Sequence, residues 1–459
     1  MINEQIFRAY DIRGVADRDL PDEVVRDIGK AIGVFFGRTE APTIALGHDP
    51  RPSSPRIKEA LTRGLLEVGV RILDVDLVPT PVVYFATVEW GCEGGVSITG
   101  SHTPREFNGL KLAKGVETLG EAEIQELKSL VMGQSFPEKE AHGFIERRDA
   151  ASEYLDYIAT RIQMPRRLRV VVDAGNAAAS EVGPRLLERI GCSVVPLFCQ
   201  FDGNFPNHFP DPVKAANLRQ LQEMVVRENA DLGVAFDGDG DRLGVVDDHG
   251  NIVLGDFILA LFACDLLSRK PGAEVIFNVT TSQAVTDEVT RCGGVPFMFK
   301  VGHSNIKSKM RETGALLAGE PSGHFYFGED YFGYDDAVYS AARLCQLVAR
   351  QDRPLSQLMQ FTKRYVILPE MRVKCADERK FEVTEWMKEQ LLQRGDVQKA
   401  IDIDGIRAHF TDGWALIRAT NTEPALNLRF EATTRERAEA IRKDVLDLLS
   451  MQLPSIEEA

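Results

Sequence analysis

Two short segments of this chain carry the residues best suited to chemistry. The first, Thr99-Gly100-Ser101-His102-Thr103-Pro104, offers a serine hydroxyl on a turn-prone loop after the apolar run Val96-Ser97-Ile98. The second, Asp237-Gly238-Asp239-Gly240-Asp241-Arg242, offers three carboxylates with almost no other side chains between them. Together these residue types indicate a serine that carries a phosphoryl group beside a magnesium site.

The spacing of the carboxylates is the stronger signal. Glycine accepts the backbone angles that a short loop needs to fold Asp237, Asp239 and Asp241 around one hard cation. Magnesium fits, because it prefers oxygen ligands and usually combines a few carboxylates with a phosphate oxygen. An EF-hand calcium loop is not indicated, since it needs glycine and glutamate where Arg242 and Asp248 stand. The flanking runs read as strands, so the acidic loop should lie between two strands.

The serine segment is not the nucleophile elbow of a hydrolase. The pattern Gly-x-Ser-x-Gly would need glycine where Thr99 and Thr103 stand. Serine in a segment rich in glycine and proline is often only a turn former. The choice for Ser101 is therefore phosphoryl chemistry or an ordinary turn.

Six separated motifs resemble, in their order along the chain, those of the alpha-D-phosphohexomutases, and most closely the bacterial phosphomannomutase/phosphoglucomutase branch. The serine segment, continued by Asn108-Gly109-Leu110-Lys111, and the acidic loop are two of them. The other four are Ala9-Tyr10-Asp11-Ile12-Arg13-Gly14, Gly302-His303-Ser304-Asn305-Ile306-Lys307, Gly319-Glu320-Pro321-Ser322-Gly323-His324 and Arg418-Ala419-Thr420-Asn421-Thr422-Glu423-Pro424.

This resemblance implies reversible conversion of a hexose 1-phosphate to the 6-phosphate, with mannose or glucose as the sugar. The reaction would pass through a bound hexose 1,6-bisphosphate, which would also act as activator. Ser101 would carry the phosphoryl group. Mg²⁺ on Asp237, Asp239, Asp241 and an oxygen of phosphorylated Ser101 would neutralise charge as the group leaves.

The resemblance also assigns residues to the substrate. Lys111, Arg13 and His324 would help proton transfer at the attacking hydroxyl. Glu320 and Ser322 would grip ring hydroxyls, and in an extended segment they would share a face with His324. A second, non-transferring phosphate would be held by Arg418, Thr420, Asn421 and Thr422. Further contacts are expected from Tyr10, Arg242, His303 and Lys300, the last because Thr280 stands where the family often has a lysine.

Three alternatives remain open at this point. Asp237 could be the nucleophile of a phosphatase or phosphotransferase that forms an acyl phosphate. The chain could also be a sugar-phosphate sensor without catalysis, although intact Ser101 and the three aspartates speak against that. Within the mutases, the alternative is a phosphoglucosamine mutase, whose last motif usually has Ser-Gly-Thr where this chain has Thr420-Asn421-Thr422.

Composition is typical of a large enzyme. The chain has 459 residues, of which 44% are hydrophobic and 27% charged, and its net charge of −15 argues against a nucleic-acid partner. No run approaches membrane-spanning length, so we expect a cytoplasmic protein without a membrane partner, as a monomer or weak homo-oligomer. The seven cysteines form no CxxC pair, and we expect all of them to be reduced thiols: Cys92, Cys192, Cys199, Cys264, Cys292, Cys345 and Cys375.

A weak internal repeat organises the first three quarters of the chain. Each copy has a strand, an amphipathic helix, a glycine and a second apolar strand, which predicts parallel strand pairs starting near Thr43, Arg169 and Glu274. The predicted fold is therefore α/β, with three related mixed-sheet domains and a smaller C-terminal α+β domain. We expect the domains at 1–146, 147–250, 251–362 and 363–459, and the resemblance adds a central active-site cleft.

Overall fold

The computed structural model describes residues 2–37, 42–136, 143–420 and 424–453. Within it the chain forms two compact units. Unit 1 comprises Met1–Gly255, Lys307–Leu317 and Ser322–Leu358, and unit 2 comprises Asp256–Ile306, Ala318–Pro321 and Met359–Ala459.

The first sheet of unit 1 is mixed. Its parallel strands β4, β2, β3 and β7 are extended on one side by the antiparallel pair β5 and β1, and the short β6 also pairs with β5. Across the sheet the strands are β1 (Ile12–Val15), β5 (Phe107–Lys114), β4 (Gly94–Ile98), β2 (Thr43–His48), β3 (Arg71–Leu77) and β7 (Phe144–Arg147), with β6 at Glu117–Thr118.

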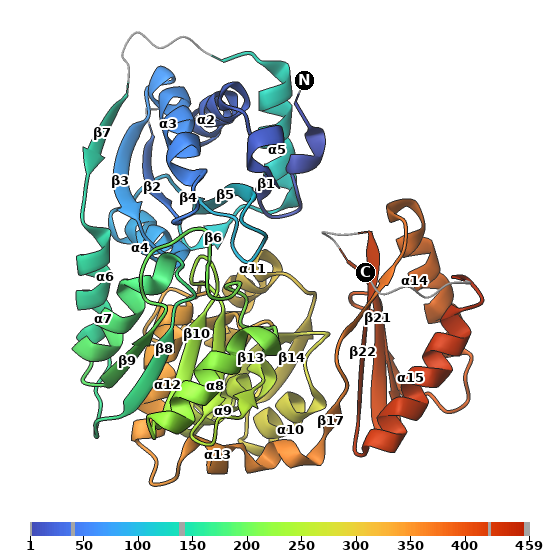
Figure 1. Ribbon diagram of the computed structural model, residues 1–459. Helices are drawn as coiled ribbons and strands as arrows, with labels where there is room; N and C mark the ends of the chain where they lie inside the picture. Colours follow the sequence, from blue (N-terminus) through green and yellow to red (C-terminus); the bar gives the residue numbers. More distant parts are fainter. Residues whose placement is uncertain (1, 38–41, 137–142, 421–423, 454–459) are drawn as a thin grey trace. The chain divides into compact units, whose positions relative to one another are not determined.

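Three helices cover one side of this sheet: α2 (Asp22–Phe36), α3 (Ser54–Glu67) and α5 (Glu121–Gly133) (Figure 1). In α2 the buried residues Val25, Ile28, Ile32 and Phe35 recur at helical spacing and enter the core. Glycine lets α2 and α3 approach closely, because a Cβ on Gly64 would lie 2.0 Å from a backbone oxygen of α2. The remaining helices of this region are η1 (Glu4–Ile6), α1 (Ala16–Asp19) and α4 (Thr80–Glu89).

The second sheet of unit 1 has the order β12-β11-β10-β8-β9. Its strands are β12 (Ile252–Val253), β11 (Leu243–Asp247), β10 (Leu232–Phe236), β8 (Arg169–Asp173) and β9 (Ser193–Leu197). Strands β10 and β11 are antiparallel and end at the pair Phe236↔Leu243, so the acidic loop joins two neighbouring strands as predicted.

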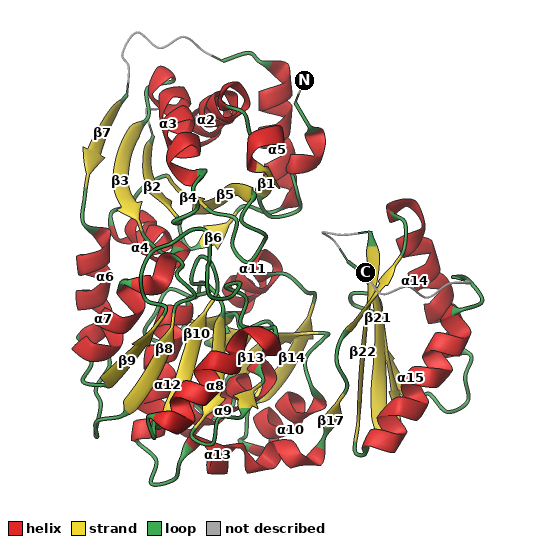
Figure 2. Cartoon of the chain, in the orientation of Figure 1, coloured by secondary structure: helices red, strands yellow, loops and turns green. Residues whose placement is uncertain are grey.

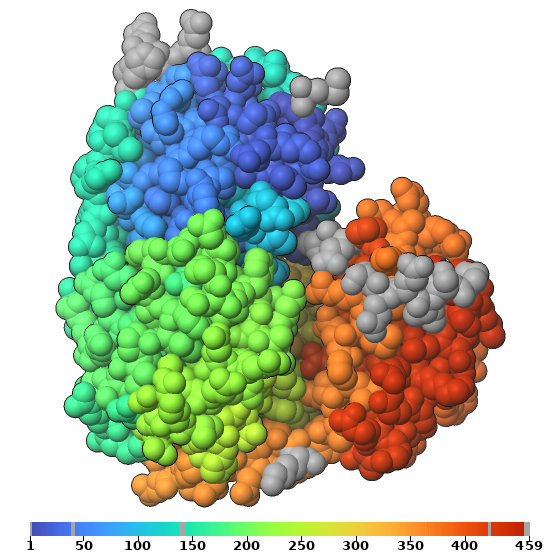
Figure 3. Space-filling model, in the orientation of Figure 1, coloured from blue at the N-terminus to red at the C-terminus, as the bar shows by residue number. Residues whose placement is uncertain are grey.

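Helices lie beside this second sheet (Figure 1), and in the space-filling view the parts of unit 1 coloured blue, cyan and green form one continuous surface (Figure 3). A hydrogen bond from the Thr80 N–H to the carbonyl oxygen of Asp239 joins the two regions at 2.9 Å. The helices here are α6 (Ala150–Ala159), η2 (Ala178–Ser180), α7 (Val182–Arg189), η3 (Ala215–Leu218), α8 (Arg219–Arg227), α12 (Ala337–Ala349) and α13 (Leu355–Leu358).

Unit 2 begins with a further strand–helix–strand segment. Strands β13 (Glu274–Asn278) and β14 (Val295–Phe299) are parallel, and α10 (Gln283–Arg291) connects them after α9 (Gly255–Arg269). Three elements lie where the chain passes between the units: α11 (His303–Thr313), β15 (Leu317–Gly319) and β16 (Phe325–Phe327).

The last part of unit 2 is an antiparallel sheet with two helices on one face (Figure 2). Its core is made by apolar residues of α14 (Asp377–Leu392) and α15 (Arg435–Leu449) and by the facing strands. The strands are β17 (Val366–Ile367), β18 (Met371–Lys374), β19 (Lys399–Ile401), β20 (Ile406–Phe410), β21 (Gly413–Ala419) and β22 (Ala425–Ala432), and η4 (Met359–Arg364) precedes them.

The predicted fold class is confirmed. All three predicted parallel pairs are present, as β2–β3, β8–β9 and β13–β14, and the C-terminal segment has the predicted α+β character. In the described part of the chain no helix combines the length and apolar character needed to cross a bilayer.

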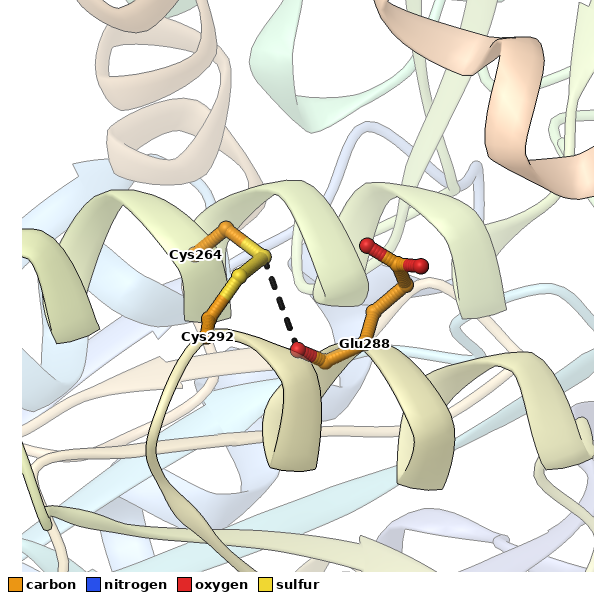
Figure 4. A group of neighbouring side chains, drawn as sticks. All are labelled: Cys264, Glu288 and Cys292. Carbon is orange, nitrogen blue, oxygen red and sulfur yellow. Dashed lines mark hydrogen bonds between the residues drawn. A yellow bond between two sulfur atoms is a disulfide. The ribbon is translucent and has the colours of Figure 1, made fainter.

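The expectation of seven reduced cysteines is wrong for two of them. Cys264 on α9 and Cys292 at the end of α10 form a disulfide (Figure 4), and the other five cysteines are free. The two helices pack side by side, which a sequence separation of 28 did not reveal. Glu288 lies close to both sulfurs, but the sulfurs are bonded to each other and its carboxylate pairs with Arg291 at 2.7 Å, so these residues do not form a metal centre.

We expect thiol titration in denaturant to find five thiols without reductant and seven after reduction. Because the bridge closes a loop of 28 residues, the Cys264→Ser/Cys292→Ser variant should lose about 3.5 kcal/mol of the free energy of unfolding of unit 2. Reductant should lower the urea midpoint of the natural chain and leave that of the variant unchanged. Seven reactive thiols without reductant would contradict the disulfide.

Candidate active site

Ser101 lies on a buried loop between β4 and β5 and has a strained backbone. Its φ of 49° is in the left-handed region, which residues other than glycine rarely adopt. The Ser101 N–H donates to the Thr99 hydroxyl at 2.8 Å, and the Ser101 hydroxyl lies 3.2 Å from Nδ1 of His102. Strain of this kind persists only where surrounding contacts impose it.

Those contacts come from Arg51, which is fully buried beneath the loop. Its Nε donates to Asp49 at 3.0 Å, and Asp49 in turn accepts the Thr99 hydroxyl and the Gly100 N–H. Gly100 has no room for a side chain, because a Cβ there would lie 2.5 Å from the guanidinium. The two Nη groups donate, at 2.7 to 3.1 Å, to the carbonyl oxygens of Ser101, Thr103, Pro104 and Phe107.

The acidic loop meets this serine directly. Asp237 Oδ2 accepts the Ser101 hydroxyl at 3.1 Å. Its Oδ1 accepts the backbone N–H groups of Gly240, Asp241 and Arg242 at 3.0 to 3.1 Å, so the loop curls around this carboxylate. A Cβ on Gly238 would lie 2.1 Å from the Ser101 carbonyl oxygen, which explains the glycine.

The three aspartates lie close enough to hold one cation, since a ligand atom from each falls within 4.8 Å of the others. Asp239 Oδ1 and Asp241 Oδ1 are buried and have no hydrogen-bond partner among the described residues. Burial, reinforced by Asp241 and Asp239, raises the pKa of Asp237 well above its usual range. A hard cation fits this all-oxygen donor set and would satisfy both orphaned atoms.

Lys111 on β5 compensates part of this charge. Its ammonium lies 2.7 Å from Asp239 Oδ2 and also pairs with Asp241. Burial alone would lower the pKa of Lys111, but the two carboxylates outweigh it and raise that pKa. For Asp241, burial would raise the pKa, but the nearby Lys111 and His324 lower it.

His324 lies beside the acidic loop. Arg242 Nε donates to His324 Nε2 at 3.0 Å, and His324 Nδ1 lies 3.2 Å from Asp335 Oδ2. Lys307, whose pKa is lowered by burial, pairs with the other Asp335 oxygen at 2.8 Å. His324 therefore has a base on one side and a guanidinium on the other.

The segment from Glu320 to His324 is not extended, so the expectation that its alternate residues share one face is wrong. It turns at Pro321-Ser322-Gly323, and Gly323 has a φ of 91°. A Cβ there would lie 2.6 Å from the Leu243 carbonyl oxygen, so backbone packing imposes the turn. Glu320 belongs to unit 2, and Ser322 and His324 belong to unit 1.

Unit 2 carries several other predicted residues. Arg418 at the end of β21 is buried and pairs with Asp404 at 3.2 Å, and Thr420 is buried close by in sequence. Glu320 accepts the side-chain N–H of Asn278 at 2.7 Å. Lys300 is exposed, and His303 begins α11. Asn421 and Thr422 lie outside the described residues.

In unit 1 the structure brings together Ser101, the three aspartates, Lys111, Arg242 and His324 through the contacts above. Arg13 on β1 pairs with Asp11, and Tyr10 is half-buried. Sequence reasoning missed Asp49 and Arg51, which directly follow β2. Polar residues at the carboxyl end of a buried parallel strand were the available signal.

Comparison with known proteins identifies the family of this chain. Models of the phosphoglucomutase/phosphomannomutase family match along the chain: alpha/beta/alpha domain I at residues 4–137, domain II at 152–250, domain III at 254–365 and the C-terminal domain at 370–448. Phosphomannomutase/phosphoglucomutase of Pseudomonas aeruginosa is 44% identical over 95% of this chain and 94% of its own length. Phosphoglucomutase of Neisseria gonorrhoeae is 40% identical over 96% of each chain.

A crystal structure of a phosphoglucomutase/phosphomannomutase family protein from Burkholderia thailandensis matches with a TM-score of 0.93 and 37% identity over 100% of both chains. Fold and site thus define an enzyme that interconverts phosphohexoses reversibly. The chain belongs to the phosphoglucomutase/phosphomannomutase family.

Two substitutions, one on the acidic loop and one on β5 beside it, should change the Mg²⁺ affinity in opposite directions. Asp239→Asn removes an anionic ligand and should weaken binding by about tenfold or more, whereas Lys111→Met removes a competing ammonium and should tighten it by a similar factor. Isothermal titration of the unphosphorylated protein with MgCl₂ measures both. Lys114→Met, at an exposed position on the same strand, is the control. Weaker binding in Lys111→Met would show that the ammonium does not compete with the cation.

Proposed function

We propose that the chain transfers a phosphoryl group between the 1- and 6-positions of mannose or glucose, with Ser101 as the carrier. The hydrogen bond between the Ser101 hydroxyl and Asp237, on a loop that Arg51 holds in a strained conformation, is the observation that carries this proposal. The names of the relatives support the sugars, since one is a phosphomannomutase/phosphoglucomutase and another a phosphoglucomutase. They favour glucose and mannose over glucosamine.

Asp237, Asp239, Asp241 and an oxygen of phosphorylated Ser101 would hold Mg²⁺, which when bound neutralises charge on the transferring group. Asp237 orients the serine hydroxyl through Oδ2, while its Oδ1 is fixed by three backbone N–H groups. Lys111 adds a positive charge beside Asp239 and Asp241, where it can also meet phosphoryl oxygens.

We assign proton transfer at the attacking sugar hydroxyl to His324, assisted by Arg13 and Lys111. Because Arg242 Nε donates to His324 Nε2, this nitrogen has a lone pair and the ring proton is on Nδ1, facing Asp335. A phosphate that draws Arg242 away would leave Nε2 able to accept the hydroxyl proton. Arg13, paired with Asp11, is a further positive group for the phosphate.

The sugar and its second phosphate need their own contacts. Glu320 and Ser322 would accept and donate hydrogen bonds to ring hydroxyls. Arg418 would hold the phosphate that does not react, as a guanidinium can contact two phosphate oxygens at once. The other substrate contacts that we propose are Tyr10, Arg242, Lys300, His303, Thr420, Asn421 and Thr422.

The setting of this activity follows from its chemistry. A hexose 1,6-bisphosphate would restore phosphate to unphosphorylated Ser101 and so act as activator. We place the enzyme in the cytoplasm, because the charge of sugar phosphates keeps them from crossing membranes, and propose a monomer or weak homo-oligomer. We retain the four domains 1–146, 147–250, 251–362 and 363–459.

Turnover of mannose, glucose and glucosamine 1-phosphates decides the sugar, and preference for glucosamine would reject our assignment.

Purified protein should show a partial mass increment of one phosphate that is absent in Ser101→Ala, whose kcat should fall by several orders of magnitude. The phosphoenzyme should resist hydroxylamine and be labile to alkali, whereas an acyl phosphate on Asp237 would be cleaved by hydroxylamine. Thr103→Ala, a hydroxyl removed from the same loop, should remain phosphorylated. An active alanine variant at position 101 would reject the carrier role.

Arg418→Ala should raise KM for the 1-phosphate and the 6-phosphate alike, since the same group must hold the non-reacting phosphate in both directions. A bidentate charged contact predicts a loss in kcat/KM of roughly 30- to 150-fold. Phosphorylation of Ser101 should persist in this variant. Arg437→Ala, which removes the ion pair with Asp412 and the contact with the Phe410 ring, is the control. Impairment in one direction alone would mean that Arg418 is not the shared anchor.

A further inference from the structure

Two successive backbone amides in unit 2 connect groups that we assign to different parts of the substrate. The Val301 N–H donates to Asp404 Oδ2 at 3.0 Å, and the Gly302 N–H donates to Glu320 Oε1 at 3.2 Å. Asp404 is paired with Arg418, the proposed phosphate anchor, and Glu320 is the proposed ligand of the sugar hydroxyls. Two adjacent residues of the backbone therefore hold both Glu320 and Asp404, the partner of Arg418.

The position of Asp404 is determined by a tight turn between β19 and β20. Gly405 has a φ of 75°, and a Cβ there would lie 2.3 Å from the carbonyl oxygen of Ile417, so only glycine fits. The turn brings Asp404 beside Arg418, which follows Ile417 on the neighbouring strand. Asp404 Oδ2 accepts Arg418 Nε at 3.2 Å, which leaves the guanidinium edge formed by its two Nη groups for a phosphate.

The contacts of Glu320 lead, through Asn278 and the loop after β13, to Arg407 at the start of β20. Glu320 Oε1 accepts from Asn278, whose own oxygen accepts the N–H and hydroxyl of Thr280. The next carbonyl oxygen, that of Thr281, accepts Arg407 Nη1 at 2.6 Å. Arg407 is fully buried and lies three residues after Asp404, at the start of β20. Both ends of the chain of contacts are therefore held by one short segment.

We propose that Asp404 is a positioning residue that orients Arg418 for the non-reacting phosphate and, through the Val301 and Gly302 amides, couples this phosphate grip to the sugar grip of Glu320. The inference rests on the roles proposed above for Arg418 and Glu320. It adds that the two ends of the substrate are not recognised independently.

The direction in which phosphate affinity changes when Asp404 is removed shows whether Asp404 positions Arg418 or merely lies near the phosphate. A carboxylate beside a phosphate site repels the phosphate, so its removal should tighten binding if Coulomb repulsion is its only effect. If Asp404 instead orients Arg418, its removal lets the guanidinium and the Val301 amide move, and binding weakens.

Binding of glucose 1-phosphate, measured by isothermal titration in a Ser101→Ala background without turnover, tests this. Asp404→Ala should weaken binding about tenfold, whereas Asp404→Asn, which keeps an oxygen acceptor, should stay within about threefold. Asp402→Asn, two residues away at an exposed position where the carboxylate pairs with Lys388, is the control and should change nothing. If Asp404→Ala does not fold by circular dichroism, Asp404→Ser replaces it with the same expectation.

A double-mutant cycle with Glu320→Gln tests the coupling. The double variant should lose clearly less affinity than the product of the two single losses, because either change already releases the paired amides. Losses that multiply would overturn the coupling. Unchanged or tighter binding in Asp404→Ala, with Arg418→Ala still weakened, would overturn the positioning role alone. Unchanged binding in Arg418→Ala would instead overturn the proposed anchor, and this inference with it.

Discussion

The hydrogen bonds from the buried Arg51 guanidinium to the serine loop are the contact on which the catalytic half of unit 1 depends. Its N–H groups donate to four carbonyl oxygens of the loop and to Asp49. These contacts hold the Ser101 backbone at a positive φ, which serine rarely adopts. A buried charge without such partners would be strongly destabilising. Lysine could not replace it, since its compact ammonium lacks the planar fork that reaches several carbonyl groups at once. The stability of this part of the fold and the conformation of the serine loop thus depend on the same residue.

The charges around the acidic loop are nearly balanced before any ligand arrives. Four buried carboxylates, those of Asp237, Asp239, Asp241 and Asp335, face the cations Lys111, Lys307 and Arg242. A divalent cation would reverse the small excess of negative charge, and a phosphoryl group on the serine would restore it. Cation and phosphoryl group therefore suit this site as a pair, because a phosphoryl group without the cation would raise the excess to about three negative charges.

The sequence was informative where chemistry and backbone signals coincide. The strands around the acidic loop, the parallel pairs and the meeting of Ser101 with Asp237 could be predicted, because glycine spacing and apolar runs are local. Arg51 and Asp404 could not, since each acts through contacts with loops more than 50 or 100 residues away, respectively. The turn at Gly323 was missed because a tertiary contact with the strand at Leu243 imposes it. The Cys264–Cys292 bridge was missed for the same reason.

In each of the two units, a buried arginine donates hydrogen bonds to the carbonyl oxygens of a loop that follows a buried strand. Arg51 donates to carbonyl oxygens of the serine loop and lies 5.2 Å from the ring centre of Phe205, and Arg407 donates to those of Val279 and Thr281 and lies 3.6 Å from that of Trp414. Each guanidinium matches several carbonyl groups while its face rests on an aromatic ring. Loops fixed in this way need no ordering when substrate binds, so binding energy remains available for the transition state.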